Sequence, residues 1–428
     1  MRRLNATIAS ATFVLAMILA LSVPARAQVT AFEGARLIVG DGRAPIENAT
    51  LVVDGTRIVQ VGAAASVNVP AGATRVSLAG KTVMPTIIDT HTHLSTTPDA
   101  LTRDLKRRGY FGVGTALSLG TDPLEMLSMR GQTIPGAARY FSAGKGITRF
   151  GDVGAPGAGR LEPGRPTFQI NSEAEARKAV QELAAHKVDI VKVWVDDREG
   201  KVQKVTPEQY AAIIDEAHKL GLRVIAHIFN MDDAKGLMRA NLDAFSHGVR
   251  DKDVDDETVA MFKARPNLVL GPNLPDRGVK VDLSWLKPGL PAAEFAKLEE
   301  ENTDRPKAQQ FHGIQARNLA KMYAAGVRLV LGTDSAPTRA GHKRGPWAPH
   351  YEMFDMVNAG VPPMQVIVAA TRNGAEFLRI ADAGTLEAGK SADFIVLEAN
   401  PLENIANTRR ISTVYLRGAA VNRAQAVP

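Results

Sequence analysis

The chain has 428 residues, of which 45% are hydrophobic. This is enough to bury a large core and exceeds the usual size of one compact domain, so we expect one large domain and a smaller companion. The net charge is +7, but only 5% of the residues are aromatic. This composition argues against nucleic-acid binding, which favours clustered basic and aromatic residues. The sequence contains no cysteine, which excludes disulfides and thiolate metal ligands.

The first 27 residues have the features of a secretory signal peptide. Arg2 and Arg3 precede an apolar stretch at about 11–21, and a small-residue cleavage motif ends at Ala27. A membrane anchor is the alternative, but the stretch is shorter than the roughly 20 residues of a spanning helix. We therefore expect a protein secreted into a bacterial periplasm, with no membrane contact after signal cleavage.

Both ends of the remaining chain have the pattern of short strands. Residues 31–63 contain β-branched runs separated by Asp-Gly turns, which predict hairpins. Similar runs return at 392–397 and 411–416. We predict that residues 28–84 and 383–428 form one composite β-sandwich domain.

Between these ends, residues 85–382 alternate apolar strands with amphipathic helices, as parallel βαβ units do. The predicted strands are 83–89, 114–118, 139–143, 190–195, 223–227, 244–247, 268–271 and 328–334. The predicted helices are 172–186, 207–220, 232–240, 256–264 and 306–325. Eight such strands suit a TIM-like (β/α)8 barrel, so the predicted fold class is α/β. An open doubly wound sheet is the alternative, but no glycine-rich nucleotide motif follows an early strand.

Two long loops stand out in this region, at 148–166 and 272–306. Both contain several prolines, and the first is also rich in glycine. Loops of this length are often lids or recognition segments, although an inert surface excursion is equally consistent with the sequence.

Polar side chains near the ends of the predicted strands could bind metal, because barrel enzymes place their active sites there. His91 and His93 are two residues apart, so an extended segment points both imidazoles to one face, where they can hold a divalent metal. His227, His247 and Asp334 each end an apolar run. The alternatives are histidines satisfied within the core and an aspartate that caps the following segment.

Lys192 lies inside the apolar run 190–195. A lysine in a buried strand is costly unless its charge is neutralised or paired. One interpretation is an ion pair with Asp196 or Asp197, or a side chain that reaches water. The other is a neutral amine that captures carbon dioxide as a carbamate, whose two oxygens can bridge two metals.

Several segments together resemble the amidohydrolase superfamily, in the branch of imidazolonepropionases and Xaa-Pro or Xaa-Arg dipeptidases. The matching segments are 84–93, 191–193, 226–227, 246–248, 332–334, 369–375 and 384–393. The chain is also similar to amidohydrolases that cleave N-aroyl amino acids such as ochratoxin. The loop at 147–152 lacks the Gly-Gly-His that two-metal dipeptidases often carry after the third strand.

The resemblance implies two divalent metal ions, for which we expect zinc. His91 and His93 would bind the first and His227 and His247 the second. It further implies a bridging carbamate, formed from carbon dioxide on Lys192, and a homo-oligomer that could be an octamer. Asp334 would bind metal and act as general base and acid.

We expect amide hydrolysis of the carboxypeptidase-like or dipeptidase-like kind, in which an activated hydroxide attacks the carbonyl and Asp334 protonates the leaving nitrogen. Basic residues after the strands could bind the free carboxylate of a small-molecule substrate, or could be solvated surface charges. These residues are Arg149, Arg250, Lys252, Arg339, His342, Lys343 and Arg344. His350 and Tyr351 could line the pocket or begin a helix. Lactone or phosphotriester hydrolysis, and a non-catalytic periplasmic binding protein, are the alternative functions.

Overall fold

The structure is a computed structural model that describes residues 29–149, 167–337 and 341–424. The expected signal peptide, Arg339 and most of the 148–166 loop lie outside the described residues. Among the helices in the described ranges, none is long and apolar enough to cross a membrane.

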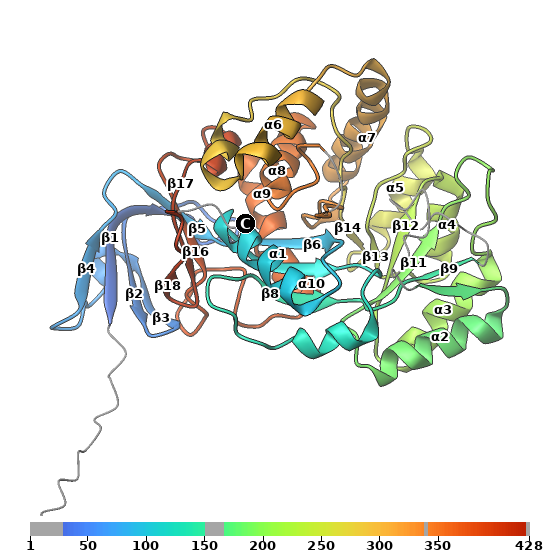
Figure 1. Cartoon of the computed structure of the whole chain (residues 1–428), viewed down its shortest axis with the longest axis horizontal. Coiled ribbons are helices and arrows are strands. Elements are labelled where there is room, and N and C mark those ends of the chain that lie inside the picture. Colours follow the sequence, from blue (N-terminus) through green and yellow to red (C-terminus); the bar gives the residue numbers. More distant parts are fainter. Residues whose placement is uncertain (1–28, 150–166, 338–340, 425–428) are drawn as a thin grey trace, which may run out of the picture.

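The two ends of the chain share one sheet, which lies at the left of Figure 1. Its strands are β1 (Thr30–Leu37), β2 (Ile46–Asp54), β3 (Arg57–Ala63), β4 (Thr74–Ser77), β5 (Thr82–Pro85), β16 (Phe394–Leu397), β17 (Ile411–Leu416) and β18 (Ala419–Ala420). Their order is β18-β17-β16-β5-β1-β2-β3, with β4 also paired to β1. Strand β5 joins the two halves, because it pairs with β1 on one side and β16 on the other. The two chain ends therefore share one sheet, while the composite β-sandwich domain stays a prediction.

The turn at Asp54-Gly55 shows why these strands pair as they do. Strands β2 and β3 are antiparallel, and Asp54 stands opposite Arg57. Gly55, one of the two loop residues, has a φ of 56°, a left-handed conformation that glycine adopts at little cost. The predicted hairpin is confirmed.

The remaining strands form two parallel sheets. One contains β6 (Ile87–Thr92), β7 (Val113–Ser118) and β8 (Arg139–Ser142). The other has the order β10-β9-β11-β12-β13-β14-β15 and is built from β9 (Ile147–Arg149), β10 (Phe168–Ile170), β11 (Val191–Val195), β12 (Val224–Ile228), β13 (Ala244–Phe245), β14 (Val269–Leu270) and β15 (Arg328–Leu329). A parallel bridge between Thr92 and Ser335 links β6 to the segment after β15. The α/β class with parallel strands is confirmed, whereas a closed barrel stays a prediction.

One predicted strand is wrong, because 83–89 divides between two sheets. Strand β5 pairs with β16, and β6 pairs with β7. The change falls at Thr86, whose backbone N–H donates to Asp393 O at 3.2 Å, while the N–H of Ile87 donates to Gly112 O at 3.0 Å. Hydrophobicity runs through both strands without a break, so it does not reveal where the partner changes.

The helices cover the parallel strands, and Figure 1 shows α2 and α3 on one side and α6 to α9 on another. They are α1 (Pro98–Tyr110), α2 (Glu173–Ala185), α3 (Pro207–Lys219), α4 (Met231–Arg239), α5 (Asp256–Lys263), α6 (Ala292–Glu301), α7 (Pro306–Ala324), α8 (Ala348–Asn358), α9 (Pro363–Ala370) and α10 (Arg372–Leu378). Short 3-10 turns occur at Ala64–Ser66, Leu124–Met129, Ser284–Gly289 and Ile405–Arg409.

All five predicted helices are confirmed to within one residue at each end, as α2, α3, α4, α5 and α7. The first two starts have the expected caps: the Ser172 side chain accepts a hydrogen bond from the Glu175 N–H at α2, and Thr206 and Gln209 form a reciprocal capping box at α3. The segment 272–306, which we expected to be a loop, instead contains a 3-10 turn and α6.

Strand β11 shows how the core directs a polar residue to the site. Val191, Val193 and Val195 belong to the main hydrophobic cluster, together with residues of α2 and α3. Because side chains alternate along a strand, Lys192 and Trp194 point to the opposite face. A Cβ on Gly146 would lie 2.1 Å from the Trp194 ring, so only glycine allows this close packing.

Lys343, which the sequence offered as a substrate-binding cation, is instead buried within the fold. Its Nζ lies 2.8 Å from both Glu352 Oε2 and Asp355 Oδ2 on α8, and it donates to Leu274 O at 2.7 Å. The exposed fractions of the three charged side chains are 4%, 0% and 3%. Lys343 therefore links α8 to the segment around Leu274, which follows β14.

Substitution Lys343→Met should lower the free energy of unfolding by roughly 3–5 kcal/mol, because buried Glu352 would lose its cation and Asp355 would keep only Arg277. The matched control is Lys252→Met, since Lys252 is half exposed and its contact with Asp251 is 3.8 Å long. The control should cost under about 1 kcal/mol. Equal denaturant midpoints for both variants would contradict the assigned role.

Candidate metal centre

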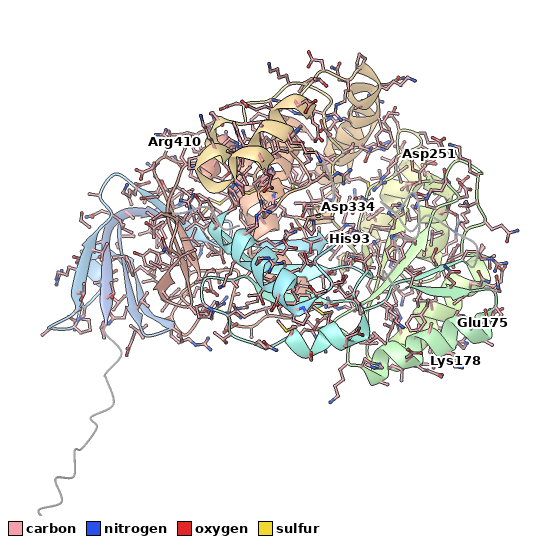
Figure 2. The ribbon with its side chains drawn as sticks, in the orientation of Figure 1. His93, Glu175, Lys178, Asp251, Asp334 and Arg410 are labelled. Carbon is pink, nitrogen blue, oxygen red and sulfur yellow. The ribbon has the colours of Figure 1, made fainter. Side chains whose placement is uncertain are left out.

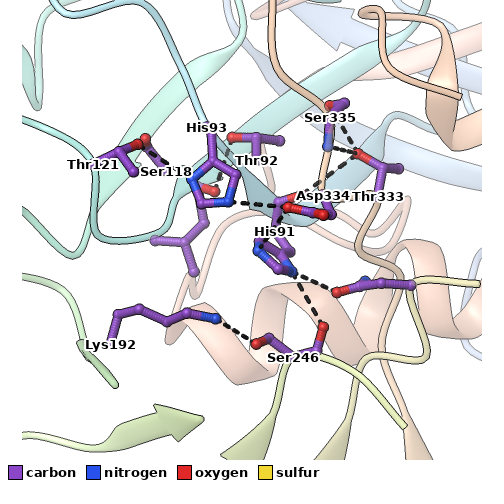
Figure 3. A network of polar contacts seen from close by, with 12 residues as sticks. His91, Thr92, His93, Ser118, Thr121, Lys192, Ser246, Thr333, Asp334 and Ser335 are labelled. Atoms are coloured by element: carbon purple, nitrogen blue, oxygen red, sulfur yellow. Dashed lines mark hydrogen bonds and ion pairs between the residues drawn. The ribbon is translucent and has the colours of Figure 1, made fainter. Parts of the chain in front are cut away.

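Three of the predicted metal ligands, far apart in the sequence, meet in the fold. His91 in β6, His247 after β13 and Asp334 after β15 each offer one ligand atom, and these atoms lie within 4.8 Å of one another. Asp334 Oδ1 is 3.5 Å from His91 Nε2 and 3.0 Å from His93 Nε2. Figure 2 places His93 and Asp334 in the middle of the molecule, and Figure 3 shows the rings of His91 and His93 next to the Asp334 carboxylate.

The other histidines extend this cluster. The ring of His247 lies 5.0 Å from that of His91 and 4.6 Å from that of His227, measured between centroids. His247 is 2% exposed, yet neither of its ring nitrogens has a hydrogen-bond partner among the described residues. The same is true of Nδ1 in His227. Buried polar atoms without partners are costly, and a bound cation would accept the lone pair of one nitrogen in each ring, so the donor set fits a metal site.

The outward nitrogens of the first two histidines are held by neighbouring groups. His91 Nδ1 lies 2.5 Å from Asn273 Oδ1 and 3.2 Å from the carbonyl oxygen of Ser246. His93 Nδ1 lies 3.2 Å from Thr121 Oγ1. These contacts turn both Nε2 atoms toward Asp334, which is how outer partners orient metal-binding imidazoles. Sequence reasoning missed Asn273 and Thr121, although both follow predicted strands.

The buried histidines are neutral near pH 7. Burial lowers the pKa of His91 and of His247 well below the ordinary value, and the nearby cations Lys192 and Arg250 respectively lower it further. Burial also lowers the pKa of His227 to about 3, although a hydrogen bond with Asp196 opposes the change. A neutral imidazole keeps the lone pair that a metal needs.

Lys192 is fully buried, and its Nζ donates to Ser246 Oγ at 2.5 Å (Figure 3). Burial lowers the pKa of its amine to about 7, despite the attraction of Asp334. Gly120 leaves room for the side chain, since a Cβ there would lie 2.9 Å from Lys192 Cγ. Ser246 was not anticipated as a partner, although it directly precedes His247.

The carboxylates that could have paired with Lys192 have other partners. Asp196 Oδ2 lies 3.1 Å from His227 Nε2, and Asp197 Oδ2 lies 3.2 Å from Lys204 Nζ. Burial alone would raise the pKa of Asp196, but its contact with His227 contributes to a net decrease to about 2. The lysine thus lies beside the histidines, and its hydrogen bond goes to the Ser246 hydroxyl rather than to Asp196 or Asp197.

Two of the predicted substrate-binding cations lie at the cluster. Arg344 Nη1 is 3.3 Å from both Oδ2 and the carbonyl oxygen of Asp334. The charge of Arg250 lowers the pKa values of His227 and His247, and burial lowers the pKa of Arg250 itself to about 10. Its Nε has no hydrogen-bond partner in the described parts of the chain.

The structure gives His350 and Tyr351 structural partners instead. His350 contacts Thr408 Oγ1 at 3.1 Å and Phe111 O at 2.8 Å through its two ring nitrogens. The hydroxyl of Tyr351 donates to Asp282 O at 3.0 Å, and both residues pack in an aromatic cluster with Trp285. Their buried positions in α8 bear out the alternative that they begin a helix.

The remaining candidates are also engaged elsewhere. His342 Nδ1 lies 3.5 Å from Asp276, and Arg149 donates to the carbonyl oxygen of Asn171 at 3.0 Å. Lys252 is half exposed. These contacts lie outside the histidine cluster, so the assignment of the three residues to substrate binding stays a prediction.

Comparison with known proteins agrees with this geometry. Residues 82–421 match the model of the amidohydrolase family. The ochratoxinase of Aspergillus niger is 26% identical, over 89% of this chain and 83% of its own, and the imidazolonepropionase of Shouchella clausii is 24% identical, over 88% and 86%. The solved structure of the A. niger ochratoxinase has a TM-score of 0.69 at 22% identity, covering 92% of this chain and 96% of that one. A Xaa-Pro dipeptidase has a TM-score of 0.71 at 22% identity, covering 92% and 99%. The expected resemblance is confirmed, and the chain belongs to the amidohydrolase family.

Proposed function

We propose that the protein is a two-metal hydrolase that cleaves the amide bond of a dipeptide or an N-acyl amino acid, including N-aroyl compounds of the ochratoxin type. The observation that carries this proposal is the buried meeting of His91, His247 and Asp334. An ochratoxinase and a Xaa-Pro dipeptidase among the similar proteins support a substrate of this kind. We further propose that the protein is secreted and acts as a homo-oligomer.

Two groups of side chains would hold the metals. His91, His93 and Asp334 would bind the first ion, and His227 and His247 the second. Lys192 would complete the set as a carbamate: its nitrogen bonds to the carbon of carbon dioxide and loses a proton. Its pKa of about 7 supports this step, because a large fraction of the amine is then uncharged and nucleophilic at neutral pH.

Two divalent cations held there would lower the pKa of a water molecule and polarise a carbonyl group. The protein's own part in the reaction falls to Asp334. Its Oδ1 can accept a proton from the attacking water and pass it to the leaving nitrogen. Its side chain is 15% exposed, against 2% for His91 and 1% for His93, so Asp334 is the group that a substrate can reach.

Positive charge beside this carboxylate favours an anionic substrate. Arg344 contacts Asp334, and Arg250 lies within electrostatic range of Asp334 and two histidines. A guanidinium binds a carboxylate through parallel N–H donors. We therefore propose that Arg250 and Arg344 bind the free carboxylate of the substrate.

Purified protein should contain about two metal ions per chain by elemental analysis and lose activity on chelation. A panel of dipeptides, N-acyl amino acids, lactones and a phosphotriester would identify the bond that is cleaved. Amide cleavage restored by Zn²⁺ agrees with the proposal. Full activity without metal, or turnover of the lactone or phosphotriester alone, would overturn it.

Substitution Asp334→Asn should reduce kcat by roughly 10²–10⁴-fold, the usual contribution of general acid–base catalysis. Asp253→Asn is the matched control, because Asp253 is 61% exposed and pairs with Arg317 on the surface. Steady-state kinetics on the best substrate should show no change for the control. Comparable kcat values for the two variants would rule out the role of Asp334.

Substitution Arg250→Gln should raise KM for an N-aroyl amino acid by roughly 10–100-fold, the range expected for a lost charged hydrogen bond. The carboxamide form of the same substrate should be cleaved equally by both proteins, because it carries no charge for Arg250 to bind. The exposed Arg317→Gln serves as the control. An equal loss on both substrates would show that Arg250 acts on the site rather than on the carboxylate.

A further inference from the structure

The backbone of Asp334 has an unfavourable conformation. Its φ is 53°, in the left-handed region that a residue with a Cβ enters only at a cost of about 1–3 kcal/mol. Such a conformation persists only when the surroundings enforce it. The groups that hold the residues on either side of Asp334 therefore decide where its carboxylate lies.

Backbone hydrogen bonds to β6 supply one constraint. The N–H of Asp334 donates to His91 O at 2.8 Å, and the N–H of His93 donates to Ser335 O at 2.8 Å. The turn is thus aligned with the strand that carries two of the proposed ligands. These bonds fix the position of the turn along the length of β6.

A second constraint comes from a buried polar network beneath the turn. Thr333 Oγ1 donates to Asp89 Oδ2 at 2.7 Å and lies 2.8 Å from Ser335 Oγ. Arg108 Nη2, at the end of α1, donates to Ser335 Oγ at 3.0 Å, and its Nη1 lies 3.5 Å from Asp89 Oδ2. All four residues are at most 4% exposed. The side chains on both sides of Asp334 are therefore tied to one buried ion pair.

The carboxylate of Asp89 also contacts the strand that carries His91. Asp89 Oδ1 accepts a hydrogen bond from the N–H of His91 at 3.2 Å. Asp89 therefore binds both the backbone of His91 and the side chain of Thr333, the residue before Asp334. A buried ion pair contributes little net stability, because the cost of desolvating its charges offsets their attraction. A stabilising effect alone therefore does not explain why Asp89 and Arg108 are buried together here.

We infer that Asp89, Arg108, Thr333 and Ser335 form a positioning unit that holds Asp334 in its left-handed conformation and sets its carboxylate against His91 and His93. This inference rests on the proposed function, in which Asp334, His91 and His93 bind a metal ion together. The four are positioning residues, because they act through Asp334.

The test compares two buried threonines, each of which donates to an aspartate at 2.7 Å. Thr333→Val removes the hydroxyl from the unit, whereas Thr258→Val removes the one that binds Asp255 at the start of α5. Zn²⁺ affinity, measured by competition with a chelator, should fall about 10–100-fold in Thr333→Val, the range seen when outer partners of metal ligands are removed. Thr258→Val and the conservative Thr333→Ser should bind Zn²⁺ as the parent does.

A crystal structure of Thr333→Val supplies a readout that needs no metal and no activity. We expect the φ of Asp334 to leave the left-handed region, or its Oδ1 to move away from His93 Nε2. Unchanged geometry together with unchanged Zn²⁺ affinity in Thr333→Val would overturn the inference. If the parent protein binds Zn²⁺ but cleaves no amide, the proposed function fails while these two readouts still test the unit.

Discussion

The site depends on one arrangement: histidine rings are buried next to the Asp334 carboxylate, and several of their nitrogens have no hydrogen-bond partner among the described residues. His247 is buried with both ring nitrogens lacking a hydrogen bond in the described ranges, and His91 and Asp334 each offer a ligand atom within 4.8 Å of its own. Desolvation keeps these rings neutral, so their lone pairs are not consumed by protons. A bound cation would accept the lone pair of one nitrogen in each ring and would balance the charge of the carboxylate, which apolar packing would not do.

The fold produces this arrangement through parallel strands whose ends lie together. The bridge from Thr92 to Ser335 brings the end of β6 against the segment after β15, so that residues over 240 positions apart share one site. Valines of β11 face the helices and thereby turn Lys192 inward. Helix α1 contributes through Arg108, whose buried guanidinium reaches the turn at Asp334. Polar groups at the site are thus held by elements that are themselves anchored in the core.

Much of this could be read from the sequence wherever the signal is local. Five helices were predicted because their periodicity and capping residues, such as Thr206 before Pro207, lie within one segment. The ligand candidates followed from their shared place after apolar runs. The tertiary partners of a residue could not be predicted in this way. The sequence around Lys343 does not show that its side chain is buried against Glu352 and Asp355. Likewise, nothing at Thr86 shows that β5 and β6 belong to different sheets. Asn273 and Asp89 matter through neighbours that only the fold supplies.

The central claim, that these side chains hold a pair of metal ions, is tested most directly by anomalous diffraction from crystals of the protein grown with Zn²⁺. Two peaks should appear, one at bonding distance from His91, His93 and Asp334 and the other from His227 and His247, with nitrogen–metal distances of about 2.0–2.1 Å. Density for a carbamate on Lys192 should lie between them. Zinc found only at other places in the chain, with the histidine cluster free of metal, would contradict the claim.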